Sequence, residues 1–172
     1  MTTRRQILSR IITNHQVKIG AEIGVGTGPT TKHLMDTHPD LQWIGVDHFP
    51  HGYPLEAGGV IGEERAREVR GKFTNLFDRY QPRLRWLDTT SLDAAKTIED
   101  GSLDLVFIDA DHSYEGCRDD ILAWRPKLRP GGWLSGHDYC HYRYPGVVRA
   151  VREYVPGFKL EEDFVWFVQV PA

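Results

Sequence analysis

The chain has 172 residues, of which 40% are hydrophobic and 26% are charged, and its formal net charge is −3. These values are typical of one globular domain, so we predict a single domain over residues 1–172. The negative charge argues against a nucleic-acid partner, and no apolar run approaches the ~18 residues that a membrane-spanning helix needs. Two cysteines are too few for a disulfide framework, so we expect a cytoplasmic protein.

The first predicted elements are a helix, a strand and a glycine-rich turn. Apolar residues at helical spacing predict a helix over residues 3–14, and an alternating apolar pattern predicts a strand over residues 17–25. The strand runs into Gly24, Gly26 and Gly28, and the proline that follows suits the first turn of a helix. Glycine tolerates positive φ and lets a ligand approach the backbone. The segment therefore predicts a nucleotide-type binding corner.

A second predicted strand, over residues 41–47, ends in an acid. Asp47 follows the last glycine of the turn by about 20 residues, and a carboxylate at that spacing suits a ribose diol. An aspartate that caps the next helix is the alternative. Residues 48–61 hold two prolines and three glycines and predict a long loop of the kind that forms lids and binding sites, with His51 on its surface.

Three further elements carry the chain across the middle of the sequence. An amphipathic pattern predicts a helix over residues 62–80, and an apolar run predicts a third strand over residues 83–88. Hydroxyl residues after that strand supply an N-cap for a short helix over residues 94–99.

Acids and histidines end the next two predicted strands. Residues 102–109 form an apolar run that ends in Asp109, and residues 133–139 form a strand that carries His137 and Asp138. A helix is predicted between them, over residues 114–127. Because the carboxyl ends of parallel strands meet at one edge of a sheet, these side chains should lie together. Without a cation the carboxylates would repel each other, and the set suits Mg²⁺, Mn²⁺, Fe²⁺ or Zn²⁺. A metal-free hydrogen-bonded network is the alternative, and His137 is either a ligand or a second base.

The spacing Glu22-x-Gly24-x-Gly26-x-Gly28 differs from the dinucleotide fingerprint G-x-G-x-x-G. It resembles motif I of the class I S-adenosylmethionine-dependent methyltransferases. The resemblance implies a cationic sulfonium ligand on the glycine turn, beside which the carboxylate of Glu22 makes electrostatic sense, with Asp47 on the ribose.

In that family the turn after the third strand contacts adenine, which makes Asp88 and Ser91 candidates for cofactor binding. Helix capping alone would also account for a hydroxyl there. The family's fold is α/β, a Rossmann-like doubly wound sheet of seven mostly parallel strands with a C-terminal antiparallel hairpin. A helix over residues 147–155, followed by strands over residues 158–163 and 164–170, matches that ending.

Residues 108–115 and 131–138 resemble the small-molecule O-methyltransferases of the catechol, macrolide-sugar and cephalosporin-tailoring types. The resemblance implies a divalent cation, Mg²⁺, Mn²⁺ or Fe²⁺, held by Asp109 and Asp138. It also implies a general base at His112, three residues after the first acid. The chain departs from the pattern at His137, where the macrolide-sugar group has an acid, and a histidine suits softer ions than Mg²⁺.

The sequence therefore predicts methyl transfer from S-adenosylmethionine to a hydroxyl of a small-molecule acceptor, assisted by a divalent metal. We expect no nucleic-acid or membrane partner, and exposed aromatic residues would permit a homodimer. One alternative is a metal-centred oxidative enzyme of the hydroxylase kind on the same fold. Another is a cofactor-binding protein without catalysis.

Overall fold

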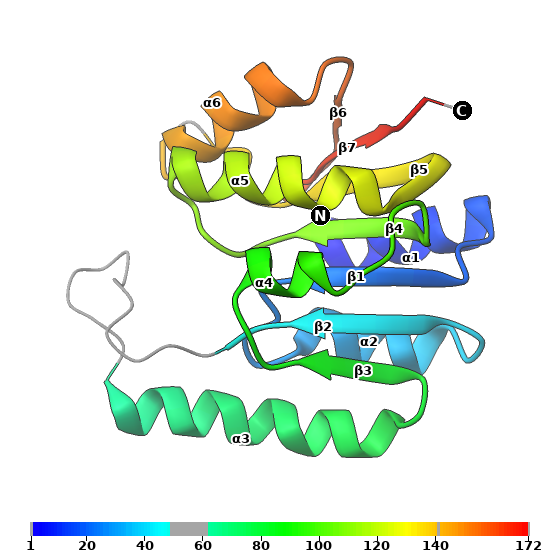
Figure 1. Ribbon diagram of the computed structural model, residues 1–172, viewed down its shortest axis with the longest axis vertical. Coiled ribbons are helices and arrows are strands. Elements are labelled where there is room, and N and C mark those ends of the chain that lie inside the picture. The colour runs from blue at the N-terminus through cyan, green and yellow to red at the C-terminus, as the bar shows by residue number, and fades with distance from the viewer. Residues whose placement is uncertain (1, 49–61, 141, 172) are drawn as a thin grey trace.

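The computed structural model describes residues 2–48, 62–140 and 142–171. The predicted loop with His51, apart from its first residue, therefore lies outside the described residues. Within them, strands and helices alternate along most of the chain (Figure 1). The strands are β1 (Ile19–Ile23), β2 (Gln42–Val46), β3 (Leu84–Leu87), β4 (Leu103–Ile108), β5 (Leu128–Gly136), β6 (Lys159–Leu160) and β7 (Trp166–Gln169). The helices are α1 (Arg4–His15), α2 (Pro29–Thr37), α3 (Glu63–Tyr80), α4 (Ser91–Lys96), α5 (Tyr114–Trp124), η1 (Arg125–Lys127) and α6 (Pro145–Tyr154).

The described strands form one sheet in the order β3-β2-β1-β4-β5-β7-β6. Strands β1 to β5 are parallel, whereas β7 is antiparallel to both β5 and β6. This arrangement confirms the predicted doubly wound sheet with its C-terminal antiparallel hairpin. From β1 the chain builds the sheet to one side through β2 and β3, and to the other through β4 and β5. Sheets of this kind bind ligands at that switch point, outside the carboxyl ends of the strands.

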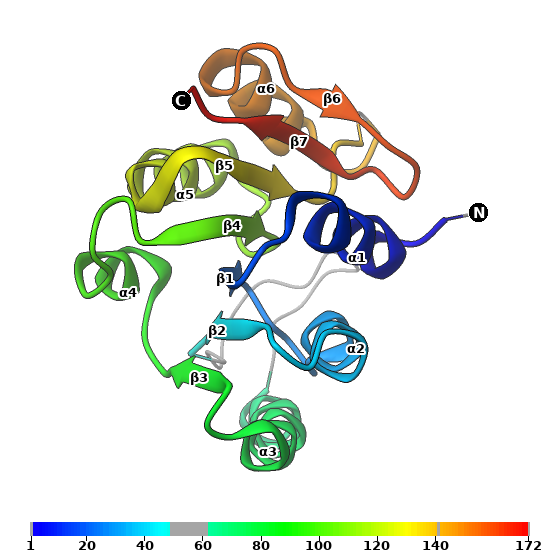
Figure 2. The same cartoon turned by 90° about the vertical axis from the view of Figure 1, so that its right-hand side faces the viewer.

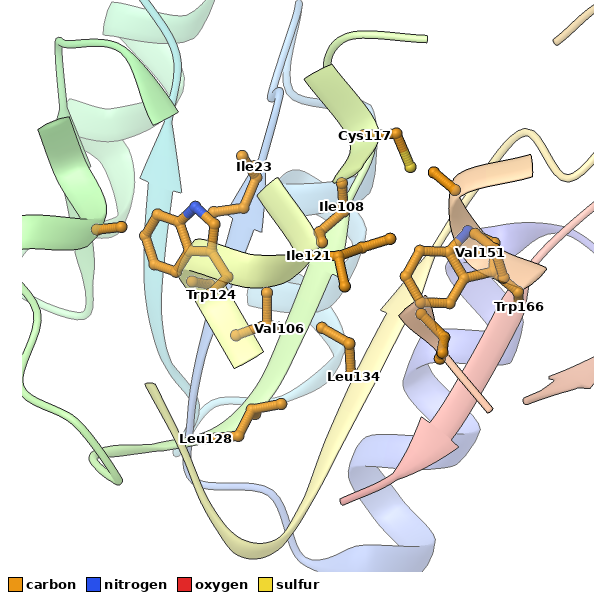
Figure 3. Packing of buried hydrophobic residues seen from close by; sticks show 14 of the residues in the cluster. Ile23, Val106, Ile108, Cys117, Ile121, Trp124, Leu128, Leu134, Val151 and Trp166 are labelled. Carbon is orange, nitrogen blue, oxygen red and sulfur yellow. The ribbon is translucent and has the colours of Figure 1, made fainter. Parts of the chain in front are cut away.

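Helices cover both faces of the sheet, so the molecule has three layers. Helices α1, α2 and α3 lie along one face, and α4 and α5 lie along the other (Figure 2). On the second face, Ile121 and Trp124 of α5 pack over Val106 and Ile108 of β4 (Figure 3). These helices bury one stripe each because their apolar residues recur at helical spacing. The packing holds the strand ends in fixed positions, and the functional side chains project from those ends.

Several predicted boundaries were wrong, among them those of β5, α5 and α4. Strand β5 begins at Leu128, not at residue 133, because its glycine-rich start still pairs with β4 across a register shift. Helix α5 ends at Trp124, where the short helix η1 takes over. Helix α4 begins at Ser91 because Thr90 is its N-cap. In the described part of the chain, no helix combines the length and the hydrophobicity needed to cross a membrane.

Candidate functional site

A cleft of about 1070 Å³ lies at the carboxyl ends of the parallel strands. The segment at the carboxyl end of each of the five parallel strands contributes residues to the lining of the cleft. The lining includes Ile23 at the end of β1 with residues 24–27 after it, Asp47 and His48 after β2, residues 89–92 after β3, residues 109–113 after β4, and Asp138 after β5. The cleft therefore occupies the switch point of the sheet, where ligands of this fold class bind.

The glycine turn has the backbone conformation that the sequence predicted. Gly24, Gly26 and Gly28 have φ values of 86°, 57° and 80°, and Gly28 is the N-cap of α2. A Cβ atom at Gly24 would overlap the carbonyl oxygen of Asp109, whereas a Cβ atom at Gly26 would meet nothing within 4 Å. Gly24 is thus needed for packing against the end of β4. Gly26 leaves an open approach to the backbone on the cleft side.

Asp47 fastens this turn. Its Oδ2 atom accepts hydrogen bonds from the backbone N–H groups of Val25 and Gly26, at 3.0 Å and 2.9 Å. Its carbonyl oxygen accepts from Trp86 Nε1 at 3.1 Å. The alternative interpretation was that Asp47 caps the next helix. In the structure its carboxylate instead accepts hydrogen bonds from the glycine turn. Because Asp47 also lines the cleft, its predicted contact with a ribose stays a prediction that the geometry allows.

Glu22 lies beneath the turn and is 1% exposed. Thr31 of α2 donates its hydroxyl to Glu22 Oε2 at 2.5 Å. Burial raises the pKa of this carboxyl to about 8, although the hydrogen bond from Thr31 opposes the shift. Glu22 also lines the cleft, so its predicted contact with the cofactor stays a prediction.

The two weaker candidates behave differently from each other. Asp88 is not among the residues that line the cleft, and its carboxylate pairs with Arg70 on the surface. Ser91 does line the cleft, and its hydroxyl donates to Asp120 and accepts from Trp124 Nε1 at 2.9 Å. Burial raises the pKa of Asp120 to about 6, against the effect of the Ser91 hydrogen bond.

The structure brings the predicted acids and histidines together. One donor atom each from Asp109, His137 and Asp138 lies within 4.8 Å of the other two. His112 Nε2 lies 2.7 Å from Asp138 Oδ2 and 4.0 Å from Asp109 Oδ1. His137 Nδ1 lies 2.9 Å from Asp138 Oδ1 and 3.7 Å from Asp109 Oδ1. We call these four residues the Asp109 cluster.

Local backbone geometry and stacking orient two members of the cluster. Asp138 has a φ of 60°, a left-handed conformation that aspartate adopts more readily than most residues. Asp138 is the second residue after the end of β5. The ring of His112 stacks on Tyr144, with 4.3 Å between ring centroids and 29° between planes. Tyr144 also lines the cleft, so it forms a wall beside the imidazole.

Arg4, the first residue of α1, adds a charge that the sequence analysis missed. Its Nη1 atom lies 2.5 Å from Asp109 Oδ2 and 3.2 Å from His137 Nδ1. In the sequence, this arginine is only one charged residue of the helix predicted over residues 3–14. Because Arg4 and Asp109 are separated by 105 residues, no local pattern could have paired them.

The pKa values of the two carboxyl groups in the cluster are shifted in opposite directions. Burial raises the pKa of Asp109, and the nearby Arg4 and His137 reduce that shift. Burial also acts to raise the pKa of Asp138, but hydrogen bonds from His112 and His137 hold it well below its ordinary value. Asp138 is therefore the carboxylate that stays ionised beside His112.

The side chains of the cluster are of the types that bind the divalent metal ion implied by the resemblance. However, the side chain of Arg4 already contacts two of them. Two carboxylates and an imidazole are suitable ligands for a divalent ion. Arg4 Nη1 contacts Asp109 and His137, two of the three donors. A fixed guanidinium beside these donors repels a second cation. The donors as arranged therefore do not accommodate a divalent ion together with Arg4.

Residues 21–139, more than half of the chain, match a family model described as a methyltransferase domain. A protein of Acanthamoeba polyphaga mimivirus, named uncharacterized protein R132, is 29% identical to this chain over 136 residues. The match covers 78% of this chain and 58% of the viral protein, so the chain spans less than two thirds of that relative's length.

Two solved structures share the fold. The O-methyltransferase NovP superposes with a TM-score of 0.67 at 20% identity, over 98% of this chain and 78% of that one. The SAH-bound methyltransferase of Podospora anserina superposes with a TM-score of 0.67 at 14% identity, over 100% of this chain and 80% of that one.

Proposed function

The chain belongs to the methyltransferase domain family, and from that premise we propose that it transfers a methyl group from S-adenosylmethionine to a hydroxyl oxygen of a small-molecule acceptor. The observation that carries this proposal is the pair of His112 and Asp138, 2.7 Å apart in a cleft that the glycine turn also lines. A base and a cofactor cradle in one cleft are what methyl transfer to a hydroxyl needs. The similarity in fold to NovP, an O-methyltransferase, supports the same reaction.

The cofactor half of the cleft is formed by the turn after β1. Gly26 leaves its backbone open to a ligand, and Asp47 holds the turn in shape from the end of β2. When bound there, S-adenosylmethionine would supply an electrophilic methyl group and leave as the neutral thioether, and the glycine turn and Asp47 would hold it. Positioning of two reactants is a large source of rate acceleration.

His112 is the proposed general base. Its Nε2 atom is buried and lies 2.7 Å from Asp138 Oδ2. With the proton of the neutral imidazole on Nε2, beside that carboxylate, Nδ1 is the basic nitrogen. Nδ1 would accept the proton that the acceptor hydroxyl loses when its oxygen is methylated. Asp138, held ionised, stabilises the imidazolium that results.

The oxidative alternative is less well supported. It requires an iron ion on Asp109, His137 and Asp138, and Arg4 already contacts the first two of these residues. For the same reason, the proposed mechanism contains no step that depends on a divalent ion.

The test compares turnover with cofactor affinity. In a screen of hydroxylated acceptors with S-adenosylmethionine, formation of the demethylated cofactor reports methyl transfer. His112→Ala should lower turnover by about 10²–10⁴-fold and leave the cofactor dissociation constant nearly unchanged. His33→Ala, at a histidine of α2 that does not line the cleft, is the matched control. Equal losses of turnover and affinity in His112→Ala would contradict the assigned role.

A further inference from the structure

We propose that Arg4 is the resident cation of the Asp109 cluster and keeps divalent ions out of it. The guanidinium contacts Asp109 Oδ2 at 2.5 Å and His137 Nδ1 at 3.2 Å, so it lies against two of the three residues that could hold a metal ion. A charge-assisted bond to a largely buried carboxylate is among the stronger hydrogen bonds in proteins. The Arg4 side chain is 32% exposed and that of Asp109 is 15% exposed, so the pair is partly shielded from solvent.

The backbone of Arg4 is anchored where its side chain can reach the cluster. Its N–H group donates to Asp163 Oδ2 at 2.7 Å, in the turn between β6 and β7. The N–H group of Thr3, the N-cap, donates to Gln6 Oε1 at 3.0 Å. Helix α1 itself is held against the sheet by four buried residues, Ile7, Leu8, Ile11 and Ile12. The guanidinium therefore projects from a fixed helix start.

The charges of the cluster explain why a cation belongs there. Asp109 and Asp138 place two carboxylates close together. Burial is the largest influence on the pKa of each, and it acts against the charged form. A positive charge offsets their mutual repulsion, and a divalent ion or an arginine can supply it. The chain delivers an arginine to the site from its own first helix. Methyl transfer, where the proposed function holds, then needs no added divalent ion.

The experiment is a calorimetric titration of Mn²⁺ into the full chain, with Arg4→Gln and Arg5→Gln as the matched variants. Arg5 is exposed and makes no contact with the cluster in the described residues, so its variant controls for the lost charge. We expect no Mn²⁺ binding by the wild type or Arg5→Gln at millimolar concentration. Arg4→Gln should bind Mn²⁺ at least about tenfold more tightly, and adding Asp109→Asn should remove that gain.

Two results would overturn the proposal. One is Mn²⁺ binding by the wild type that Arg4→Gln does not strengthen. The other is a folded Arg4→Gln variant that, like the wild type, shows no binding of Mn²⁺. If Arg4→Gln loses its helical circular dichroism, millimolar Mn²⁺ should restore the signal, and failure to do so also counts against the proposal. Titration of the same samples with S-adenosylmethionine separates the two proposals. If the wild type does not bind S-adenosylmethionine, that result contradicts the methyl-transfer function and leaves the role of Arg4 untouched.

Discussion

The two halves of the cleft are constructed differently. The glycine turn is one short segment, with Gly24, Gly26 and Gly28 between β1 and α2 and one fastening residue from the end of β2. The Asp109 cluster instead combines residues after β4, residues after β5 and an arginine from the first helix. Backbone conformation shapes the first half, and long-range charge pairing shapes the second. Mutations should therefore damage the two halves in different ways.

The largest expected effect on stability comes from the substitution Gly24→Ala in the glycine turn. Gly24→Ala places a Cβ atom against the carbonyl of Asp109 at a φ of 86°, and both the overlap and the backbone strain are costly. We expect a loss of about 3 kcal/mol or more in the free energy of unfolding, measured by denaturant titration.

Gly26→Ala is the matched control for this effect. Its φ of 57° strains an alanine, but the added atom meets nothing within 4 Å, so the cost should be about 1 kcal/mol. Its main consequence should be weaker cofactor binding, because the methyl group projects into the open approach. Equal losses of stability in the two variants would contradict the distinction between a packing glycine and a binding glycine.

Glu22→Gln tests the charge of the buried carboxyl beneath the turn. The folded pKa of about 8 exceeds the ordinary 4.5, so the folded state binds a proton that the unfolded state releases between these values. The wild type should accordingly lose stability as pH rises from about 4.5 to about 8, and Glu22→Gln should lack this loss. At pH 8 the variant should be more stable by on the order of 2–4 kcal/mol. Parallel pH profiles for the two proteins would contradict the assigned pKa.

A smaller effect separates the two acids that end neighbouring strands. Asp47→Asn should weaken S-adenosylmethionine binding by about tenfold, because the carboxylate both holds the turn and faces the cleft. Asp88→Asn should leave the affinity unchanged, since Asp88 pairs with Arg70 away from the cleft lining. Calorimetric titration of both variants measures the difference, and an equal loss in both would remove the special role of Asp47.

The predictability of each region follows from its construction. The positive φ values of the glycine turn and the meeting of Asp109, His112 and Asp138 could be predicted, because strand ends and glycines carry local signals. The contact of Arg4 could not, because it depends on where α1 lies against a turn near the other end of the chain. The raised pKa of Glu22 could not be predicted either, because its cause is burial by packing and not the residue type.

The most direct test of the whole account is a calorimetric titration of the purified protein with S-adenosylmethionine, once with EDTA and once with Mg²⁺ or Mn²⁺. The account predicts binding with a micromolar dissociation constant, on the order of −8 kcal/mol, that is the same in both conditions. Absence of binding in every condition would contradict the central claim that this cleft holds the methyl donor.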